Sequence, residues 1–173
     1  MNIYKERASR ENNIKNVIID DIIIDDENKY YNILSLYKLL PLRANEFIKI
    51  KIVSYDECTK DVTNELDTEH NFIVVEEKKL ILNETKTTIH DEVKLKDEVI
   101  EFIKNKLPEK IDNNKPIFSK TLRTFERILK DTGFTSQNIR KIYANSNKDN
   151  VPEASRTLNH TIGTHLSKYM DIS

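Results

Sequence analysis

The feature that most constrains the fold is a change of hydrophobic period between residues 71 and 95. Before it, apolar residues at helical spacing predict a helix over 30–40, which stops at Pro41, and a second helix that begins near Arg43 and runs through Ile52. Residues 54–70 are polar without a clear period and predict a loop. Within 71–95, the short segments at 72–75, 80–82 and 92–95, which are rich in apolar residues, predict three antiparallel strands.

Helical spacing returns after residue 95. We predict helices over 99–107, stopped by Pro108, over 122–129, with Gly133 as C-cap, and over 136–143, with Ser136 as N-cap. A polar loop over 145–152 and two short helices around His160 and Tyr169 complete the chain. The expected fold class is therefore α+β: mainly helical, with a small three-stranded antiparallel sheet.

Domain organisation follows from the same pattern. Residues 1–29 are mostly polar at their start and predict a leader or linker segment, and residues 30–173 predict one domain with a real core. Only 2 of the 173 residues are glycine, which excludes a glycine-rich phosphate loop. Any phosphate handled by this chain must be held by side chains or helix ends.

Charge is distributed unevenly along the chain. Residues 1–99 carry 15 Lys and Arg against 21 Asp and Glu, a balance of −6, and residues 100–173 carry 13 against 8, a balance of +5, which together give the net charge of −1. The basic half is the one suited to a polyanionic partner such as double-stranded DNA.

Other classes of protein are disfavoured by what the sequence lacks. Cys58 is the single cysteine, so an internal disulfide is excluded, and a reducing, intracellular location (cytoplasm or nucleus) is expected. No apolar run is long enough for a membrane helix, and residues 1–10 do not form a secretory signal. His70 and His90 have no partner at ligand spacing, so we expect neither a metal nor another cofactor.

The stretch Leu158–Tyr169 carries the most specific chemical signal. His160 precedes Tyr169 by nine residues. A tyrosine, whose pKa is ordinarily near ~10, becomes a useful nucleophile only where its proton has a destination and cations neutralise the charge that it attacks. Cations are present earlier in the chain, at Arg43, Lys86 and Arg140.

In this order, the five residues resemble the catalytic domain of tyrosine recombinases (phage-type integrases) and, more distantly, type IB DNA topoisomerases. Arg43-Ala44-Asn45-Glu46 matches the family's Arg-x-x-Glu helix start, and Gln137-Asn138-Ile139-Arg140 matches its His-x-x-Arg box. Lys86 lies at a predicted hairpin tip, nine residues before Leu95, as the family's lysine does. The resemblance extends from about Tyr30 to Tyr169.

The resemblance implies a role for each residue in DNA strand cleavage and rejoining. Tyr169 would attack the phosphate to form a 3′-phosphotyrosyl bond, and Arg43 and Arg140 would clamp the non-bridging oxygens. Lys86 would protonate the leaving 5′-oxygen, and His160 would bind the phosphate or assist proton transfer. The implied enzyme needs neither ATP nor metal, and its protomers would self-associate on DNA in a synaptic complex.

Several points depart from the family pattern or stay open. Gln137 stands where the family has histidine, and it can donate a hydrogen bond but cannot shuttle a proton. Lys78 or Lys79 could serve in place of Lys86, and His165 is expected to be structural. The family's N-terminal DNA-clamp domain is not expected within residues 1–29.

The sequence is therefore consistent with three functions. The first is a site-specific recombinase or integrase of a virus or other mobile element. The second is a type IB topoisomerase fragment, which would relax nearly any plasmid. The third is a DNA-binding module of the same fold that has lost catalytic activity.

Overall fold

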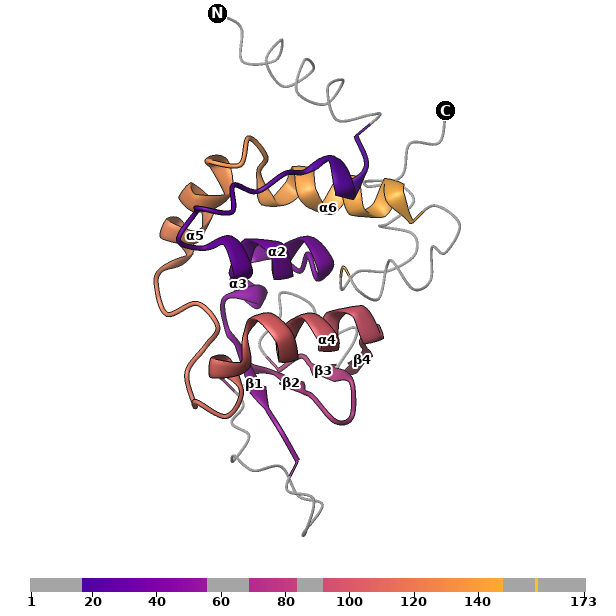
Figure 1. The fold of residues 1–173 in the computed structure, drawn as a ribbon, viewed down its shortest axis with the longest axis vertical. Coiled ribbons are helices and arrows are strands. Elements are labelled where there is room, and N and C mark those ends of the chain that lie inside the picture. The colour runs from indigo at the N-terminus through magenta and orange to yellow at the C-terminus, as the bar shows by residue number, and fades with distance from the viewer. Residues whose placement is uncertain (1–16, 56–68, 84–91, 148–157, 159–173) are drawn as a thin grey trace, which may run out of the picture.

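The computed structural model describes residues 17–55, 69–83, 92–147 and 158, and these form a helical layer above a small sheet (Figure 1). The helical elements are η1 (Ile19–Asp21), α2 (Tyr31–Leu39), α3 (Ala44–Phe47), α4 (Asp97–Lys106), η2 (Pro108–Lys110), α5 (Leu122–Lys130) and α6 (Ser136–Ser146). The strands are β1 (Ile50–Val53), β2 (Asn71–Val74), β3 (Lys79–Ile81) and β4 (Glu92–Lys94). The mixed fold class expected from the sequence is confirmed.

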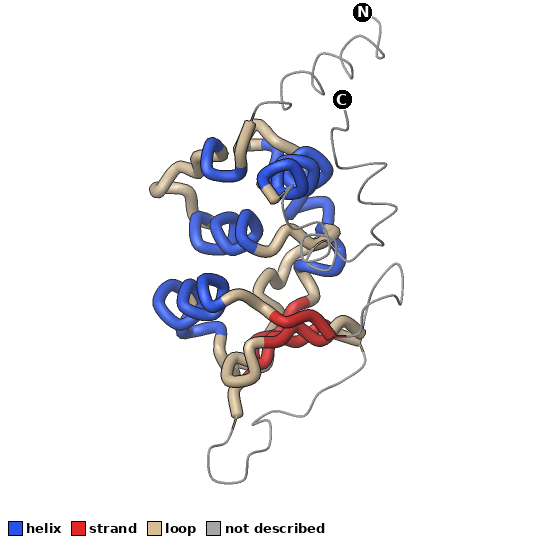
Figure 2. Tube along the Cα trace, turned by 90° about the vertical axis from the view of Figure 1, so that its right-hand side faces the viewer, coloured by secondary structure: helices blue, strands red, loops and turns tan. Residues whose placement is uncertain are grey.

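The sheet has four strands in the order β1-β2-β3-β4. The three predicted strands are present as β2, β3 and β4, and both of their pairings are antiparallel, with Ile73 opposite Leu80 and Leu80 opposite Val93. The fourth strand, β1, pairs parallel with β2, with Ile50 opposite Asn71. The sheet lies at one end of the molecule, and α4 lies between it and α2 (Figure 2).

Strand β1 corrects one prediction. The helix expected to run from Arg43 through Ile52 ends at Phe47, and residues 50–53 form a buried strand instead. Ile50-Lys51-Ile52-Val53 contains three β-branched residues, which pack more readily on a pleated sheet than in a helix. Residues 111–117 cover the outer edge of β1, because the Asp112 and Ile117 amides donate to the Ile52 and Ile50 carbonyls.

The predicted helices 30–40, 99–107, 122–129 and 136–143 appear as α2, α4, α5 and α6. Three boundary predictions are wrong. The N-cap of α6 is Thr135, whose hydroxyl accepts from the Asn138 amide, and not Ser136; α6 also continues through Asn145 and Ser146, where the sequence predicts loop. The C-cap of α5 is Asp131, and Gly133 follows it with a left-handed φ of +89°.

One hydrophobic core joins the helical layer to the sheet. Its centre is an aromatic cluster in which the Tyr37 ring lies 4.8 Å from that of Phe47 and 5.4 Å from that of Phe125. Such edge-to-face pairs add to the free energy gained by burying the rings. The cluster fixes α2, α3 and α5 against one another, and so sets the position of the loop that precedes Arg43.

Residues 17–22 lie against the helical layer. The Ile19 amide donates to Ser146 Oγ at 3.0 Å, and Ile22 is buried in the core. Within the part of the chain that is described, no helix is long and apolar enough to cross a membrane.

Candidate active site

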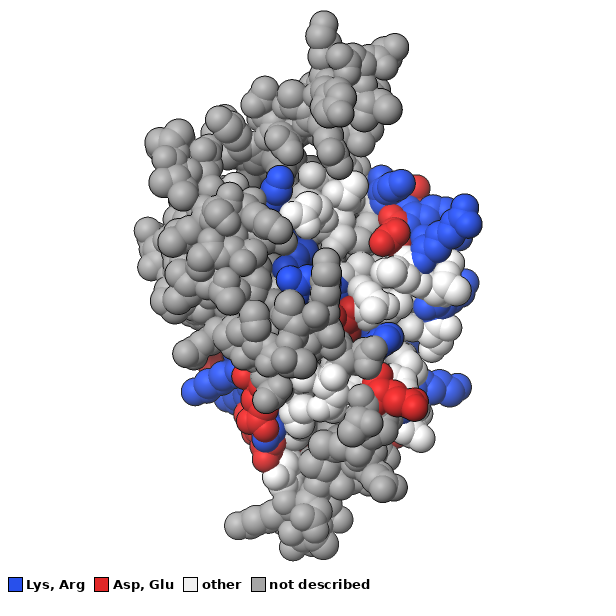
Figure 3. Space-filling model, turned by 180° about the vertical axis from the view of Figure 1, so that it is seen from behind, with Lys and Arg blue, Asp and Glu red and all other residues white. Residues whose placement is uncertain are grey.

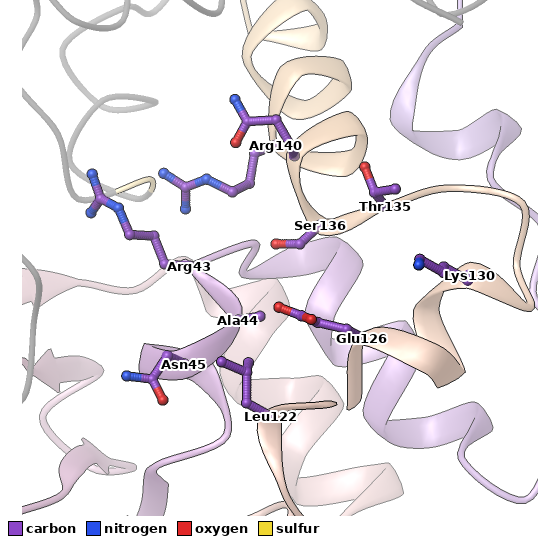
Figure 4. A pocket seen from close by; sticks show the side chains of 10 residues that line it. Arg43, Ala44, Asn45, Leu122, Glu126, Lys130, Thr135, Ser136 and Arg140 are labelled. Atoms are coloured by element: carbon purple, nitrogen blue, oxygen red, sulfur yellow. The ribbon is translucent and has the colours of Figure 1, made fainter. Parts of the chain in front are cut away.

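An open pocket of about 490 Å³ lies between α3, α5 and the start of α6. It brings together three of the predicted site residues, Arg43, Gln137 and Arg140 (Figure 4). Arg43 and Gln137 are 94 positions apart in the sequence (137 − 43) and meet here through the fold alone. The pocket is also lined by Ala44, Asn45, Leu122, Glu126, Lys130, Thr135 and Ser136.

Arg43 occupies the N-cap position of α3, at the end of the loop that follows α2. Its Nη1 lies 3.6 Å from Oε1 of Glu46, the last residue of the Arg-x-x-Glu motif. Glu46 is only 2% exposed, whereas Arg43 is 26% exposed, so a buried carboxylate holds a guanidinium that reaches the pocket. Screening by water is weaker for such a pair than for two exposed groups, and the pair therefore orients Arg43.

Glu46 also marks the junction between α3 and the sheet. Its carbonyl oxygen accepts from the side-chain amide of Asn71, which is fully buried at the start of β2. Oδ1 of Asn71 in turn accepts from the Asn83 amide at 2.9 Å. The short helix that follows Arg43 is thus tied to Asn71 and Asn83 of the β2–β3 hairpin.

Arg140 lies on α6 and is 1% exposed. Its Nη1 donates to the Pro41 carbonyl at 2.9 Å, and its Nη2 donates to the Leu158 carbonyl at 2.7 Å. Arginine suits this position because its planar fork presents donors in several fixed directions at once. The side chain therefore fixes the backbone at Pro41 and at Leu158, which lie two positions before Arg43 and His160 in the sequence.

Tyr37 provides a second tie between these elements. Its buried hydroxyl contacts the Leu42 carbonyl at 2.7 Å and Ser136 Oγ at 2.5 Å. The residue before Arg43 and the first residue of α6 are thus held to one side chain of α2. In Figure 4, the side chains of Arg43 and Arg140 extend toward the same side of the pocket.

The first turn of α6 is stabilised by a capping box. Thr135 Oγ1 accepts from the Asn138 amide and Asn138 Oδ1 accepts from the Thr135 amide, both at 3.1 Å. Ser136 and the exposed Gln137 follow on this turn and line the pocket. Sequence reasoning missed Thr135, although the spacing of Thr135 and Asn138 is a capping signal.

The remaining predicted residues cannot be placed in this site. Lys86, His160 and Tyr169, together with His90 and His165, lie outside the described residues. The two alternatives to Lys86 are described: Lys78 Nζ lies 2.7 Å from Asp97 Oδ1, and Lys79 Nζ lies 2.9 Å from Glu77 Oε2. The hydrogen bond that each lysine donates to its carboxylate raises the pKa of that lysine.

A metal centre is not formed by the residues that the structure describes, because they contain no group of three or more His, Cys, Asp or Glu side chains able to hold an ion. Within this part of the chain, the pocket offers arginine, lysine, amide and hydroxyl groups, with Glu126 as its one carboxylate. Such a lining is suited to an oxyanion such as a phosphodiester.

Comparison with known proteins identifies one similar fold. The crystal structure of XerA recombinase superposes with a TM-score of 0.55 at 15% sequence identity; the match covers 98% of this chain and 58% of that one. The chain therefore spans little more than half the length of that recombinase. No family model matches the sequence, and no curated protein matches it either. At this identity the likeness shows the fold, which is similar to that of a tyrosine recombinase.

Proposed function

We propose that this chain is the catalytic domain of a tyrosine recombinase, which cleaves and rejoins double-stranded DNA. The observation that carries the proposal is the meeting of Arg43 and Arg140 at one pocket, in a chain whose fold is similar to that of a recombinase. These are the two arginines that the family resemblance assigns to the scissile phosphate. Their guanidinium groups would neutralise the charge that grows on the non-bridging oxygens in the transition state.

The proposed reaction needs three further groups. The Tyr169 hydroxyl attacks the phosphorus, and a bond between its oxygen and the DNA 3′-phosphate replaces the bond to the 5′-oxygen. Lys86 gives a proton to that leaving oxygen, and His160 assists proton transfer. Attack by the 5′-hydroxyl of a partner strand reverses these steps and releases Tyr169, so the number of phosphodiester bonds is conserved.

Two observations support this assignment of roles. The Leu158 carbonyl accepts from Arg140, so Leu158, two positions before His160 in the sequence, contacts a residue that lines the pocket. Both alternatives to Lys86 hold carboxylate partners on the sheet side of the molecule, which favours Lys86 as the proton donor. In the biological role that we propose, protomers assemble on paired DNA sites during integration of a virus or other mobile element.

The experiment is incubation of the chain with nicked duplex substrates in the absence of metal, followed by a denaturing gel. A protein band shifted by a covalently attached DNA strand is expected. The second candidate, a type IB topoisomerase fragment, would relax supercoiled plasmid of any sequence, whereas the recombinase should act on particular paired sites. The third, an inactive module favoured by Gln137, would bind DNA without forming an adduct.

A further inference from the structure

A second cationic surface lies where α5 faces the start of α2, next to the candidate active site but outside it. Glu126 and Lys130 line the pocket described above, whereas Arg127, one residue beyond Glu126, is rotated about 100° from it around the helix axis. On that side the Tyr30 ring lies close to Lys29 and Lys120. The tyrosine patch is defined here as Lys29, Tyr30, Lys120 and Arg127.

The geometry of the tyrosine patch is unusual because cations converge on a neutral group. Lys29 Nζ lies 5.6 Å and Lys120 Nζ 5.8 Å from the Tyr30 ring centroid. Phe118 packs edge-on against that ring at 5.8 Å and anchors it to the core. The ring is therefore a fixed platform that gathers two ammonium groups through cation–π contacts.

The cations of the tyrosine patch have no carboxylate partner among the described residues. Within the described part of the chain, no carboxylate lies within ion-pair distance of Lys29, Lys120 or Arg127. The adjoining pocket, of about 290 Å³, is lined by three lysines and one glutamate, Glu109. The hydrogen bond with Lys120 and the charges of Lys120, Lys29 and Arg127 lower the pKa of Tyr30, so the surroundings of its hydroxyl favour negative charge.

The patch belongs to a larger basic edge. Lysine and arginine side chains gather along the side of the molecule formed by α5 (Figure 3). Lys120, Arg123, Arg127 and Lys130 are all exposed there. The helix has nine residues and is therefore about 13 Å long, so its two cationic faces lie within reach of one duplex.

We propose that the tyrosine patch is a second anchor for the DNA backbone, which binds a phosphate flanking the one held by Arg43 and Arg140. This inference rests on the proposed function, because it requires that the duplex bound at the active-site pocket also contacts the other face of α5. Lys29, Lys120 and Arg127 neutralise the flanking phosphate, and the Tyr30 hydroxyl donates a hydrogen bond to one of its oxygens. The anchor touches no base edge, so it strengthens binding without selecting sequence.

The test is the binding of the full chain to a fluorescein-labelled duplex, measured by anisotropy over a series of KCl concentrations. Lys120→Gln and Arg127→Gln should each weaken binding about three- to tenfold at low salt, and should reduce the slope of log K against log [KCl] by about 0.9 for each phosphate that is no longer neutralised. Tyr30→Phe should weaken binding about two- to fivefold with an unchanged slope, because it removes a hydrogen bond and no charge.

The matched control is Lys115→Gln, which makes the same change in net charge on the loop beside β1. It should leave the slope at the native value. The proposal would be overturned if the native chain and the patch variants gave equal slopes of log K against log [KCl]. It would also be overturned if the patch variants lost binding to polyglutamate, a polyanion without phosphates, but bound the duplex as the native chain does. Failure of the proposed function would give a different result. If the chain forms no covalent adduct, but the slope of log K against log [KCl] still depends on Lys120 and Arg127, the recombinase activity is contradicted and the phosphate anchor is supported.

Discussion

Nη1 of Arg140 donates a hydrogen bond to the Pro41 carbonyl at 2.9 Å, and this contact joins residues 99 positions apart. The same side chain donates from Nη2 to the Leu158 carbonyl at 2.7 Å. One buried arginine therefore holds α6 to the loop before Arg43 and to Leu158. Its place in the structure makes Arg140 a positioning group as well as a proposed ligand of the phosphate.

Arg140→Lys should destabilise the protein although it keeps the positive charge. A lysine ammonium at the end of a flexible stem cannot hold two carbonyls in the directions that the planar fork reaches, so a buried acceptor loses its donor. We expect a loss of about 2 kcal/mol in the free energy of unfolding, measured by urea denaturation. Arg123→Lys on the exposed face of α5 is the matched control and should unfold as the native chain does; equal stability of the two variants would contradict this role for Arg140.

Thr135→Ala should loosen the first turn of α6. The substitution removes the oxygen that accepts from the Asn138 amide, and such losses at an N-cap cost about 1 kcal/mol. A fall in melting temperature of about 2–4 °C is expected, with a matching loss of DNA affinity because Ser136 and Gln137 line the pocket. Thr135→Ser keeps the hydroxyl and should restore both; an alanine variant as stable as the serine variant would show that the cap is unimportant.

Gln137→His should increase the rate of strand cleavage. Gln137 is exposed on the wall of the pocket, where an imidazole could take up or give a proton and an amide cannot. We expect about a tenfold or greater increase in the rate of adduct formation, with a new dependence on pH near ~6.5. The comparison is with Gln137→Asn, and a histidine variant with the same rate and pH profile as the asparagine variant would exclude proton transfer from this position.

Glu77 should make the stability of the sheet dependent on pH. Its carboxylate accepts hydrogen bonds from Lys79 and from the Tyr55 hydroxyl, and these lower its pKa below 4.5. A carboxyl group whose pKa is depressed on folding stabilises the protein above its unfolded pKa, and that contribution is lost as the pH falls through the folded value.

The measurement is the melting temperature of the native chain and of Glu77→Gln between neutral and acid pH. At neutral pH the native chain should melt at a higher temperature than Glu77→Gln. This difference in melting temperature should shrink below pH 4.5. If the difference in melting temperature between the native chain and Glu77→Gln stays constant with pH, the carboxylate charge of Glu77 does not contribute to stability.

Most of the fold follows from the periodicity of the sequence. The spacing of apolar residues predicted α2, α4, α5 and α6, and the short apolar segments between residues 71 and 95 predicted the antiparallel unit β2-β3-β4. Strand β1 is not predicted, although apolar and charged residues alternate strictly in Ile48-Lys49-Ile50-Lys51-Ile52. The predicted helix that begins near Arg43 runs through these residues, whereas the helix in the structure ends at Phe47. A short helix followed closely by a strand contains both the helical and the strand period of hydrophobic residues within about ten positions. Neither period dominates the roughly 11 to 18 residues that are needed to recognise it.

The site was predictable only in part, for a different reason. Motif spacing identified Arg43, Gln137 and Arg140, and the fold brings these three to one pocket. The groups that hold them could not be predicted, because Arg140 donates to backbone carbonyls, which every residue carries and no sequence pattern marks. The hydrogen bond between Tyr37 and Ser136 likewise depends on how α2 and α6 pack, and no sequence pattern pairs these two residues.

The most direct test of the recombinase proposal is to locate the covalent bond. The native chain, Tyr169→Phe and the control Tyr31→Phe, which changes an exposed tyrosine of α2, are incubated with a nicked duplex without metal. Each reaction is then resolved on a denaturing gel and digested for mass spectrometry. The account predicts an adduct with the native chain and with Tyr31→Phe, a nucleotide on the peptide that contains Tyr169, and no adduct with Tyr169→Phe. An adduct of undiminished yield with Tyr169→Phe, or no adduct with any of the three chains on any paired site, would contradict it.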